Sequence, residues 1–364
     1  MVLQLDSALT FWISVALTIV TTLSVVIFWR KLLRKGVINF LTRLLLILLC
    51  QILVVLTVGI SINRTNGFYS SWGDLLGKRV DYSSVAVDSA SSTKVNSAIL
   101  KGAQKSLNGQ VIIKEIVKGT KSGISNVVYL VLPKSAVLSI KDGKSIDMDR
   151  TKVIEFFVGF PSQTENWLRS LDLTKALATS EKVNPGFSII GVIPAVNVAG
   201  MQDLECMNFP NSGVQTETWL TSDIRTFVNN RLGLSPRRWG VIGVSTGGWC
   251  AAMLSIKHEE LFYGAVSIAG YYRPALNKNT DPLIKTQLES DYDFPTLEAA
   301  MTGRIDMLLI ASVGDIYSYA ETKKFIDLNH PNINYQYIEL PSGGHNARVW
   351  ISQLGVSLDW LKKH

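Results

Sequence analysis

The sequence is poor in the residues that define disulfide-rich domains and most metal centres. Its 364 residues include 3 cysteines and 4 histidines. Cys50 lies in an apolar stretch, which leaves Cys206 and Cys250, and two cysteines do not form the framework of a disulfide-rich secreted domain. Cys250 belongs to a pattern typical of a buried helix face, so we do not expect a bridge between the two. We predict no cofactor and no metal ion.

Long basic blocks are also absent. The formal net charge is +7, but most of this excess lies in residues 1–64, and the remainder of the sequence is close to neutral. A nucleic-acid surface needs a basic patch or stripe, which residues 65–364 lack. We therefore expect no nucleic-acid partner, and nothing in the sequence indicates a particular protein partner.

Charge is missing altogether from two apolar stretches, residues 7–29 and 44–62. Each is long enough to cross the roughly 30 Å hydrocarbon core of a bilayer as a helix. A secretory signal is the alternative for the first stretch, but it is too long for the apolar region of a signal peptide and no basic residue precedes it. The sequence predicts two transmembrane helices that contact the lipid bilayer.

Basic residues gather between the two stretches, whereas Asp6 is the one charged residue before the first. They are Arg30, Lys31, Arg34, Lys35 and Arg43. Because basic loops stay in the cytoplasm, the chain after Ile62 is expected on the outer side of a cell membrane. The predicted organisation is a transmembrane hairpin over 1–64, a juxtamembrane connector over 65–108 and a catalytic domain over 109–364.

Apolar runs of strand length divide residues 109–364. The first two, "QVIIKEIV" and "NVVYLVLP", indicate a β-hairpin. Later runs alternate with segments of helical pattern, as expected for buried parallel strands and crossover helices. These runs are "KVIEFFVGF", "FSIIGVIPAV", "WGVIGVS", "YGAVSIAGYY", "IDMLLIASV" and "NYQYIEL". The predicted fold class is α/β, a mostly parallel sheet with helices on both faces.

One serine stands between a buried-type strand and a helix, in "GVSTGGWCAAML". In a nucleophile elbow the serine occupies a strained strand-to-helix turn, and the residues two before and two after it must be nearly without side chain. Gly243 and Gly247 meet this requirement around Ser245. The context predicts that Ser245 is a catalytic nucleophile.

A serine nucleophile needs a base, and histidine has a suitable pKa. His258 lies at a helix end, His330 in a polar turn, and His364 ends the chain. His345 lies in "ELPSGGHNARVW", between the last apolar run and the last helical segment, and is therefore the predicted base.

The third triad member should be an acid after the penultimate strand. "IDMLLIASVGDIYSYAE" offers Asp315, which we favour, and Glu321 as the alternative. Two backbone N–H groups should stabilise the oxyanion: that of Thr246, and that of Phe160 in the loop after "VIEFFVGF", since Pro161 has no N–H.

Three motifs carry a resemblance to a known family: "TETWLTSDI", "GVSTGGWCAAML" and "GGHNARVWISQL". They resemble the esterase D type of α/β-hydrolases, and especially the antigen 85 mycolyltransferases. The resemblance covers roughly residues 109–364. It implies an α/β-hydrolase fold with Ser245, Asp315 and His345 as the triad. The hairpin followed by "NRTNGFYSSW" is similar to membrane-tethered proteins of the esterase type in actinobacteria.

The sequence also departs from the mycolyltransferases. Val158 and Pro161 fall where that family has an acid and a base that bind trehalose, and only Cys206 has a counterpart in its disulfide loop. A segment after Tyr271, up to Thr302, has the character of an insertion over the site. The resemblance therefore implies acyl-ester chemistry but not trehalose as the preferred acceptor.

Together these features predict a membrane-anchored, extracytoplasmic serine esterase or acyltransferase that forms an acyl-enzyme from lipid or carbohydrate esters of the cell envelope. Two alternatives stay open. The first is a non-catalytic envelope scaffold with a hydrolase fold, and the second is a serine peptidase.

Overall fold

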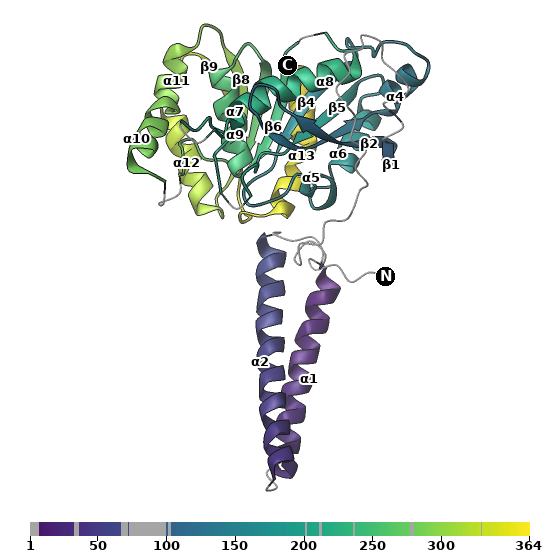
Figure 1. The fold of residues 1–364 in the computed structure, drawn as a ribbon, viewed down its shortest axis with the longest axis vertical. Coiled ribbons are helices and arrows are strands. Elements are labelled where there is room, and N and C mark those ends of the chain that lie inside the picture. The colour runs from purple at the N-terminus through teal and green to yellow at the C-terminus, as the bar shows by residue number, and fades with distance from the viewer. Residues whose placement is uncertain are drawn as a thin grey trace. The chain divides into compact units, whose positions relative to one another are not determined.

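The chain folds into two units, Met1–Val80 and Asp81–His364, seen in Figure 1. The structure is a computed structural model that describes residues 7–32, 36–66, 72, 100, 103–200, 202–210, 213–235, 237–276, 280–328 and 330–364. Residues 33–35, which include the basic Arg34 and Lys35, and most of the predicted juxtamembrane connector lie outside the described residues.

The first unit is a pair of helices, α1 (Ala8–Leu32) and α2 (Val37–Asn66), that lie side by side (Figure 1). Thr18 Oγ1 lies 3.1 Å from Thr57 Oγ1, so a hydrogen bond joins the two helices. The apolar side chains point outward, and 6% of each apolar window is buried. Both helices are long and apolar enough to cross a membrane, over Ala8–Trp29 and Val37–Arg64.

The second unit is built on a 9-stranded sheet with the order β1-β2-β3-β5-β4-β6-β7-β8-β9. The strands are β1 (Ala103–Leu107), β2 (Gln110–Lys118), β3 (Ser125–Leu132), β4 (Thr151–Phe157), β5 (Ser188–Pro194), β6 (Trp239–Val244), β7 (Phe262–Ile268), β8 (Ile305–Ser312) and β9 (Ile333–Leu340). The β1–β2, β2–β3 and β3–β5 pairs are antiparallel, and all other pairs are parallel. The predicted hairpin is β2–β3, and β1 precedes it within the stretch assigned to the connector.

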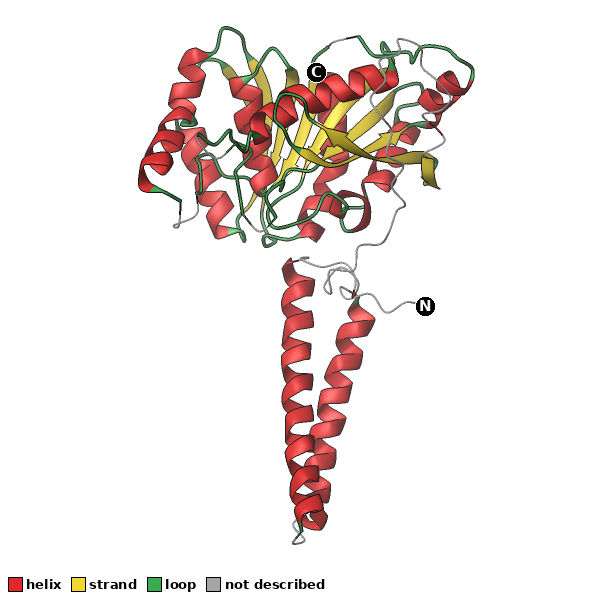
Figure 2. Cartoon of the chain, in the orientation of Figure 1, coloured by secondary structure: helices red, strands yellow, loops and turns green. Residues whose placement is uncertain are grey.

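Helices cover both faces of this sheet (Figure 2). They are α4 (Lys134–Lys141), α5 (Asn166–Arg169), α6 (Leu173–Val183), α7 (Thr216–Thr218), the π-helical turn η2 (Trp219–Asp223), α8 (Ile224–Leu232), α9 (Thr246–Lys257), α10 (Pro282–Asp291), α11 (Phe294–Ala300), α12 (Ile316–Asp327) and α13 (Ala347–Lys363). The core accordingly has two parts. One packs α5, α6 and α13 against the sheet, and the other packs α4, α8, α9 and α11 against the opposite face.

The parallel strands bring four loops to one edge of the sheet. The carboxyl ends of β4, β6, β8 and β9 lead into the loops that carry Phe160, Ser245, Asp315 and His345. Because neighbouring parallel strands end at the same edge, side chains far apart in sequence meet there, as is usual for ligand sites in α/β sheets.

Candidate active site

Ser245 lies on a strained turn between β6 and α9. Its backbone has φ 57° and ψ −125°, a conformation that residues with a side chain rarely adopt. Neighbouring backbone holds it there: the Ser245 N–H donates to Ile268 O of β7 at 2.9 Å, and Ser245 O accepts from the N–H of Gly248 at 2.8 Å. Strand β6 and helix α9 therefore pass closely on either side of the serine.

The two elbow glycines leave no room for side chains. A Cβ on Gly243 would lie 1.8 Å from Gly247 O, and one on Gly247 would lie 2.2 Å from Phe157 O. Both obstacles are backbone atoms, which cannot rotate away. Glycine at these two positions is thus what allows the turn that presents Ser245.

The three predicted triad side chains meet at the edge of the sheet. Ser245 Oγ lies 2.8 Å from Nε2 of His345, and Nδ1 of His345 lies 2.6 Å from Oδ2 of Asp315. Burial disfavours the ionised form of Asp315, but hydrogen bonds from His345 and Ser318 outweigh it and lower the pKa of this carboxyl. An ionised Asp315 can hold the imidazole in the tautomer whose Nε2 accepts the serine proton.

The loop after β4 passes directly against the nucleophile. A Cβ on Gly159 would lie 2.8 Å from Ser245 Cβ. Asn197, in the loop after β5, holds this loop because its Nδ2 donates to Gly159 O at 3.3 Å and to Ser162 O at 2.7 Å. Within the described ranges, the N–H groups of Phe160 and Thr246 donate to no other protein group. Thr246 directly follows Ser245, and Phe160 follows Gly159, which packs against Ser245.

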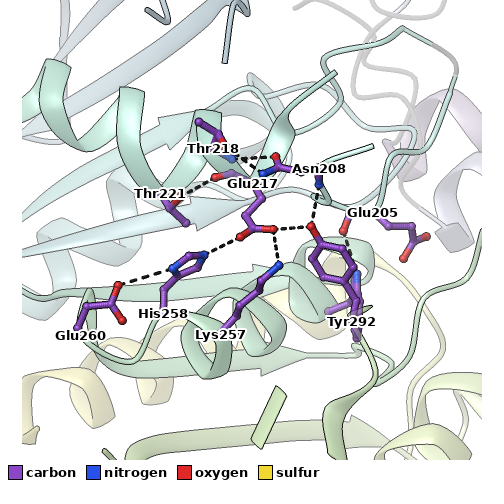
Figure 3. Close-up of polar contacts among 10 residues, drawn as sticks. Glu205, Asn208, Glu217, Thr218, Thr221, Lys257, His258, Glu260 and Tyr292 are labelled. Carbon is purple, nitrogen blue, oxygen red and sulfur yellow. Dashed lines mark hydrogen bonds and ion pairs between the residues drawn. The ribbon is translucent and has the colours of Figure 1, made fainter. Parts of the chain in front are cut away.

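The other histidines are held away from Ser245 by partners of their own. His258 Nε2 lies 2.7 Å from Glu217 Oε1, and Lys257 and Tyr292 bind the same carboxylate (Figure 3). His330 lies between Glu298 and Phe325 O, at 2.7 Å from each, and Nδ1 of His364 lies 2.9 Å from Trp360 O. Each of these rings serves local packing.

Glu321, the alternative triad acid, faces a different set of groups. Its carboxylate pairs with Arg273 Nε at 3.0 Å and with Lys324 Nζ at 2.8 Å. The acid that binds His345 is Asp315, because it begins α12 directly at the end of β8, whereas Glu321 lies further along that helix.

The expectation for Cys206 and Cys250 was wrong, since they form a disulfide with a Cα–Cα distance of 5.7 Å. Cys250 does lie on a buried face of α9, as its pattern indicates. The loop after β5 folds over that face and brings Cys206 to it. Because the two positions are separated by 44 in sequence, no local pattern could reveal this approach.

The same loop carries two acidic residues that the sequence analysis did not single out. Asp203 and Glu205 lie beside Thr246, and Tyr271 bonds to Glu205 and to Thr246. Two acidic residues shortly before a cysteine, in "QDLECMNF", were the one signal available. Among the described residues, no group of three or more His, Cys, Asp and Glu side chains is arranged to hold a metal ion.

Comparisons with known proteins identify the fold. No family model matches the chain. A curated relative, an uncharacterized protein of Corynebacterium glutamicum, is 21% identical over an alignment of 227 residues, and the match covers 58% of this chain and 52% of that protein. The chain thus spans about half the length of the curated relative it matches.

Solved structures resemble the second unit over nearly their whole length. Fluorophosphonate-binding serine hydrolase F of Staphylococcus aureus is 17% identical with a TM-score of 0.57, and the match covers 69% of this chain and 98% of that one. An S-formylglutathione hydrolase of Agrobacterium tumefaciens is 13% identical with a TM-score of 0.56, covering 71% and 97%. The S-formylglutathione hydrolase FrmB of S. aureus is 17% identical with a TM-score of 0.54, covering 69% and 96%.

These likenesses confirm the predicted α/β-hydrolase fold. The solved structures that share it are serine hydrolases and esterases of the type to which the sequence motifs pointed. At these identities the likeness establishes the fold, and the chemistry of this chain has to be argued from its own site.

Proposed function

We propose that this chain is a serine esterase or acyltransferase that works through an acyl-enzyme. Ser245 is the nucleophile, His345 the general base and acid, and Asp315 the residue that orients His345. The N–H groups of Thr246 and Phe160 form the oxyanion hole. One observation carries the proposal: the continuous contact from Ser245 Oγ through His345 to Asp315, at 2.8 and 2.6 Å.

The reaction follows from these positions. Ser245 Oγ attacks the ester carbonyl carbon while its proton passes to His345 Nε2, and the carbonyl oxygen gains the negative charge that the two N–H groups stabilise. Collapse of this intermediate breaks the bond to the alcohol, which leaves with the proton from His345. Water or a second alcohol then attacks the acyl-enzyme with the same base, giving free acid or a new ester.

The backbone strain at Ser245 favours catalysis over the scaffold alternative. A non-glycine residue at a positive φ costs on the order of 1–3 kcal/mol, and such strain gathers at functional sites. A scaffold with the same fold needs neither this strain nor two glycines packed against backbone. We propose an ester as the substrate, and not a peptide, because the solved structures that share the fold include esterases.

A fluorophosphonate probe tests the nucleophile without knowledge of the substrate. We expect wild-type protein to be labelled, and Ser245→Ala to be unlabelled while its thermal unfolding stays close to that of the wild type. The matched control is Ser255→Ala, which removes a buried serine from α9 and should leave labelling intact. Labelling of Ser245→Ala equal to that of wild type would refute the assignment.

We further propose that α1 and α2 anchor the enzyme in a cell membrane with the hydrolase unit on the extracytoplasmic side, where lipid or carbohydrate esters of the envelope are the substrates. The basic residues between the two apolar stretches support this orientation. In a Cys50→Ala background, Ala90→Cys should react with an impermeant maleimide on intact cells, and Leu33→Cys should react after lysis. The reverse pattern would place the site in the cytoplasm.

A further inference from the structure

Next to the proposed oxyanion hole lies a carboxyl pair, Asp203 and Glu205, that the mechanism does not use. Glu205 is 2% exposed, and both its carboxyl oxygens lie 2.8 Å from Tyr271 Oη. Tyr271 Oη lies 3.2 Å from Thr246 Oγ1. Thr246 Oγ1 in turn lies 3.5 Å from Oδ2 of Asp203, a long hydrogen bond. The two carboxyl groups are thus linked through one phenol and one alcohol.

The loop that holds the carboxyl pair is fixed to helix α9. The Cys206–Cys250 disulfide joins them directly, and Trp249 Nε1 donates to Glu205 O at 3.0 Å. Glu205 has φ 53°, in the left-handed region that side chains other than glycine disfavour. Several contacts therefore hold a strained backbone in place, and they keep the pair beside the residue that follows the nucleophile.

Counting protons shows what this chain of contacts requires. It contains three links: Glu205 to Tyr271, Tyr271 to Thr246, and Thr246 to Asp203. Each link needs one proton, and the two hydroxyl groups supply two. A third proton, on a carboxyl group, completes the chain, so that Glu205 donates to Tyr271, Tyr271 to Thr246, and Thr246 to Asp203. With both carboxyl groups ionised, one link has no donor.

The surroundings favour that third proton. Burial, with a further contribution from the Asp203 charge, raises the pKa of Glu205 to about 8, and burial also raises the pKa of Asp203. Among the described residues, no lysine or arginine pairs with either carboxyl group.

The groups that face the carboxyl pair from the packed elements are neutral or paired. Helix α9 presents Thr246, Trp249 and the disulfide. The segment after β7 presents Tyr271, whose ring centroid lies 6.1 Å from that of Tyr317 on α12. Behind Tyr317, Arg273 is bound to Glu321 at 3.0 Å.

We propose that Asp203 and Glu205 are positioning residues that share one proton across Tyr271 and Thr246, and that this proton keeps a second negative charge away from the oxyanion hole. The inference rests on the proposed function of Ser245. Thr246 connects the two parts, because its hydroxyl belongs to the proton chain and its N–H belongs to the oxyanion hole. Loss of the proton opposes formation of the oxyanion by charge repulsion and removes one link that fixes Thr246.

The consequence is an alkaline limit that a Ser-His-Asp site does not have by itself. Deprotonation of the histidine base raises the rate with pH to a plateau. Here the rate should fall again above about pH 8. The added negative charge would lie a few side-chain lengths from the oxyanion. At an effective dielectric constant near 20, its repulsion should lower the rate on the order of tenfold.

The test is the pH dependence of the second-order rate of fluorophosphonate labelling, from pH 6 to 10, on the full chain in detergent. Glu205→Gln mimics the protonated side chain, so it should keep the rate at pH 7 and lose the alkaline fall. Asp203→Asn leaves Glu205 as the one ionisable carboxyl of the pair, and the amide N–H can donate to Thr246, so neither a second charge nor an unfilled link can arise and this variant should also lose the alkaline fall. A merely structural role would not remove the alkaline fall in both variants.

The matched control is Glu155→Gln on β4. Glu155 is fully buried, and burial raises its pKa to about 8 as well, but its ionic partner is Arg225, at 3.9 Å. This variant should retain the wild-type alkaline fall. A fall that is equal in wild type, Glu205→Gln and Asp203→Asn would overturn the inference and leave Ser245 as nucleophile. A wild type that is not labelled at any pH would overturn the proposed function together with the inference.

Discussion

Replacing Gly243 by alanine tests how closely the elbow depends on space. The added Cβ would lie 1.8 Å from Gly247 O, 2.2 Å from Gly247 C and 2.7 Å from Gly248 N. Ordinary contact begins at 3.4 Å, so the start of α9 would have to move by about 1.6 Å relative to β6. All three obstacles belong to the backbone of the first turn of α9, and the shift therefore cannot be absorbed by a side-chain rotation.

The functional cost follows from what this turn carries. Ser245 and Thr246 begin it, so a shift of this size changes both the Ser245–His345 contact and the direction of the Thr246 N–H. A misplacement of about 1 Å can cost about 100-fold in rate, and overpacking typically costs about 1–3 kcal/mol of stability. We expect Gly243→Ala to label at least about 100-fold more slowly than wild type and to unfold at a lower temperature.

The assay is the rate of fluorophosphonate labelling together with thermal unfolding of the same preparations. Gly355→Ala is the matched control, because a Cβ at this position on α13 meets nothing within 4 Å. It should label like wild type and unfold at the same or a slightly higher temperature, since alanine favours helix over glycine. A Gly243→Ala protein with the labelling rate and unfolding temperature of wild type would refute the steric argument.

Three further predictions concern the disulfide, the Glu217 network and the acceptor. Replacing both Cys206 and Cys250 by serine should lower the free energy of unfolding by about 4 kcal/mol in the chain-entropy account of a loop of this length; denaturant titrations that coincide with those of the oxidised wild type would contradict it. Hydrogen bonds from His258, Lys257 and Tyr292 outweigh burial and lower the pKa of Glu217 to about 2. Glu217→Gln should therefore destabilise the fold by up to about 3 kcal/mol above pH 5, with the difference from wild type shrinking as the pH falls from about 4.5 towards 2. Because Val158 and Pro161 offer no polar side-chain partner to a sugar, a short-chain nitrophenyl ester with trehalose should yield free acid and little acyl-trehalose by mass spectrometry, and preferential formation of acyl-trehalose would contradict this.

The sequence alone was sufficient for features that depend on neighbouring residues. The two uncharged stretches are long enough to span a bilayer whatever surrounds them, and they form α1 and α2. The apolar runs predicted the hairpin β2–β3 from its two strand-length segments, and the strands β4 to β9 because buried parallel strands need continuous apolar side chains. The spacing of Gly243, Ser245 and Gly247 predicted the turn, since the steric demand of an elbow is local.

The tertiary structure decided which distant residues meet. Both Asp315 and Glu321 follow β8, and only the way α12 begins brings the first of them to His345. The order of the strands places the loop after β5 beside α9, which creates the Cys206–Cys250 bridge and sets Glu205 against Tyr271. These contacts join segments tens of residues apart, and they depend on strand order and loop path, which local hydrophobic periodicity does not encode.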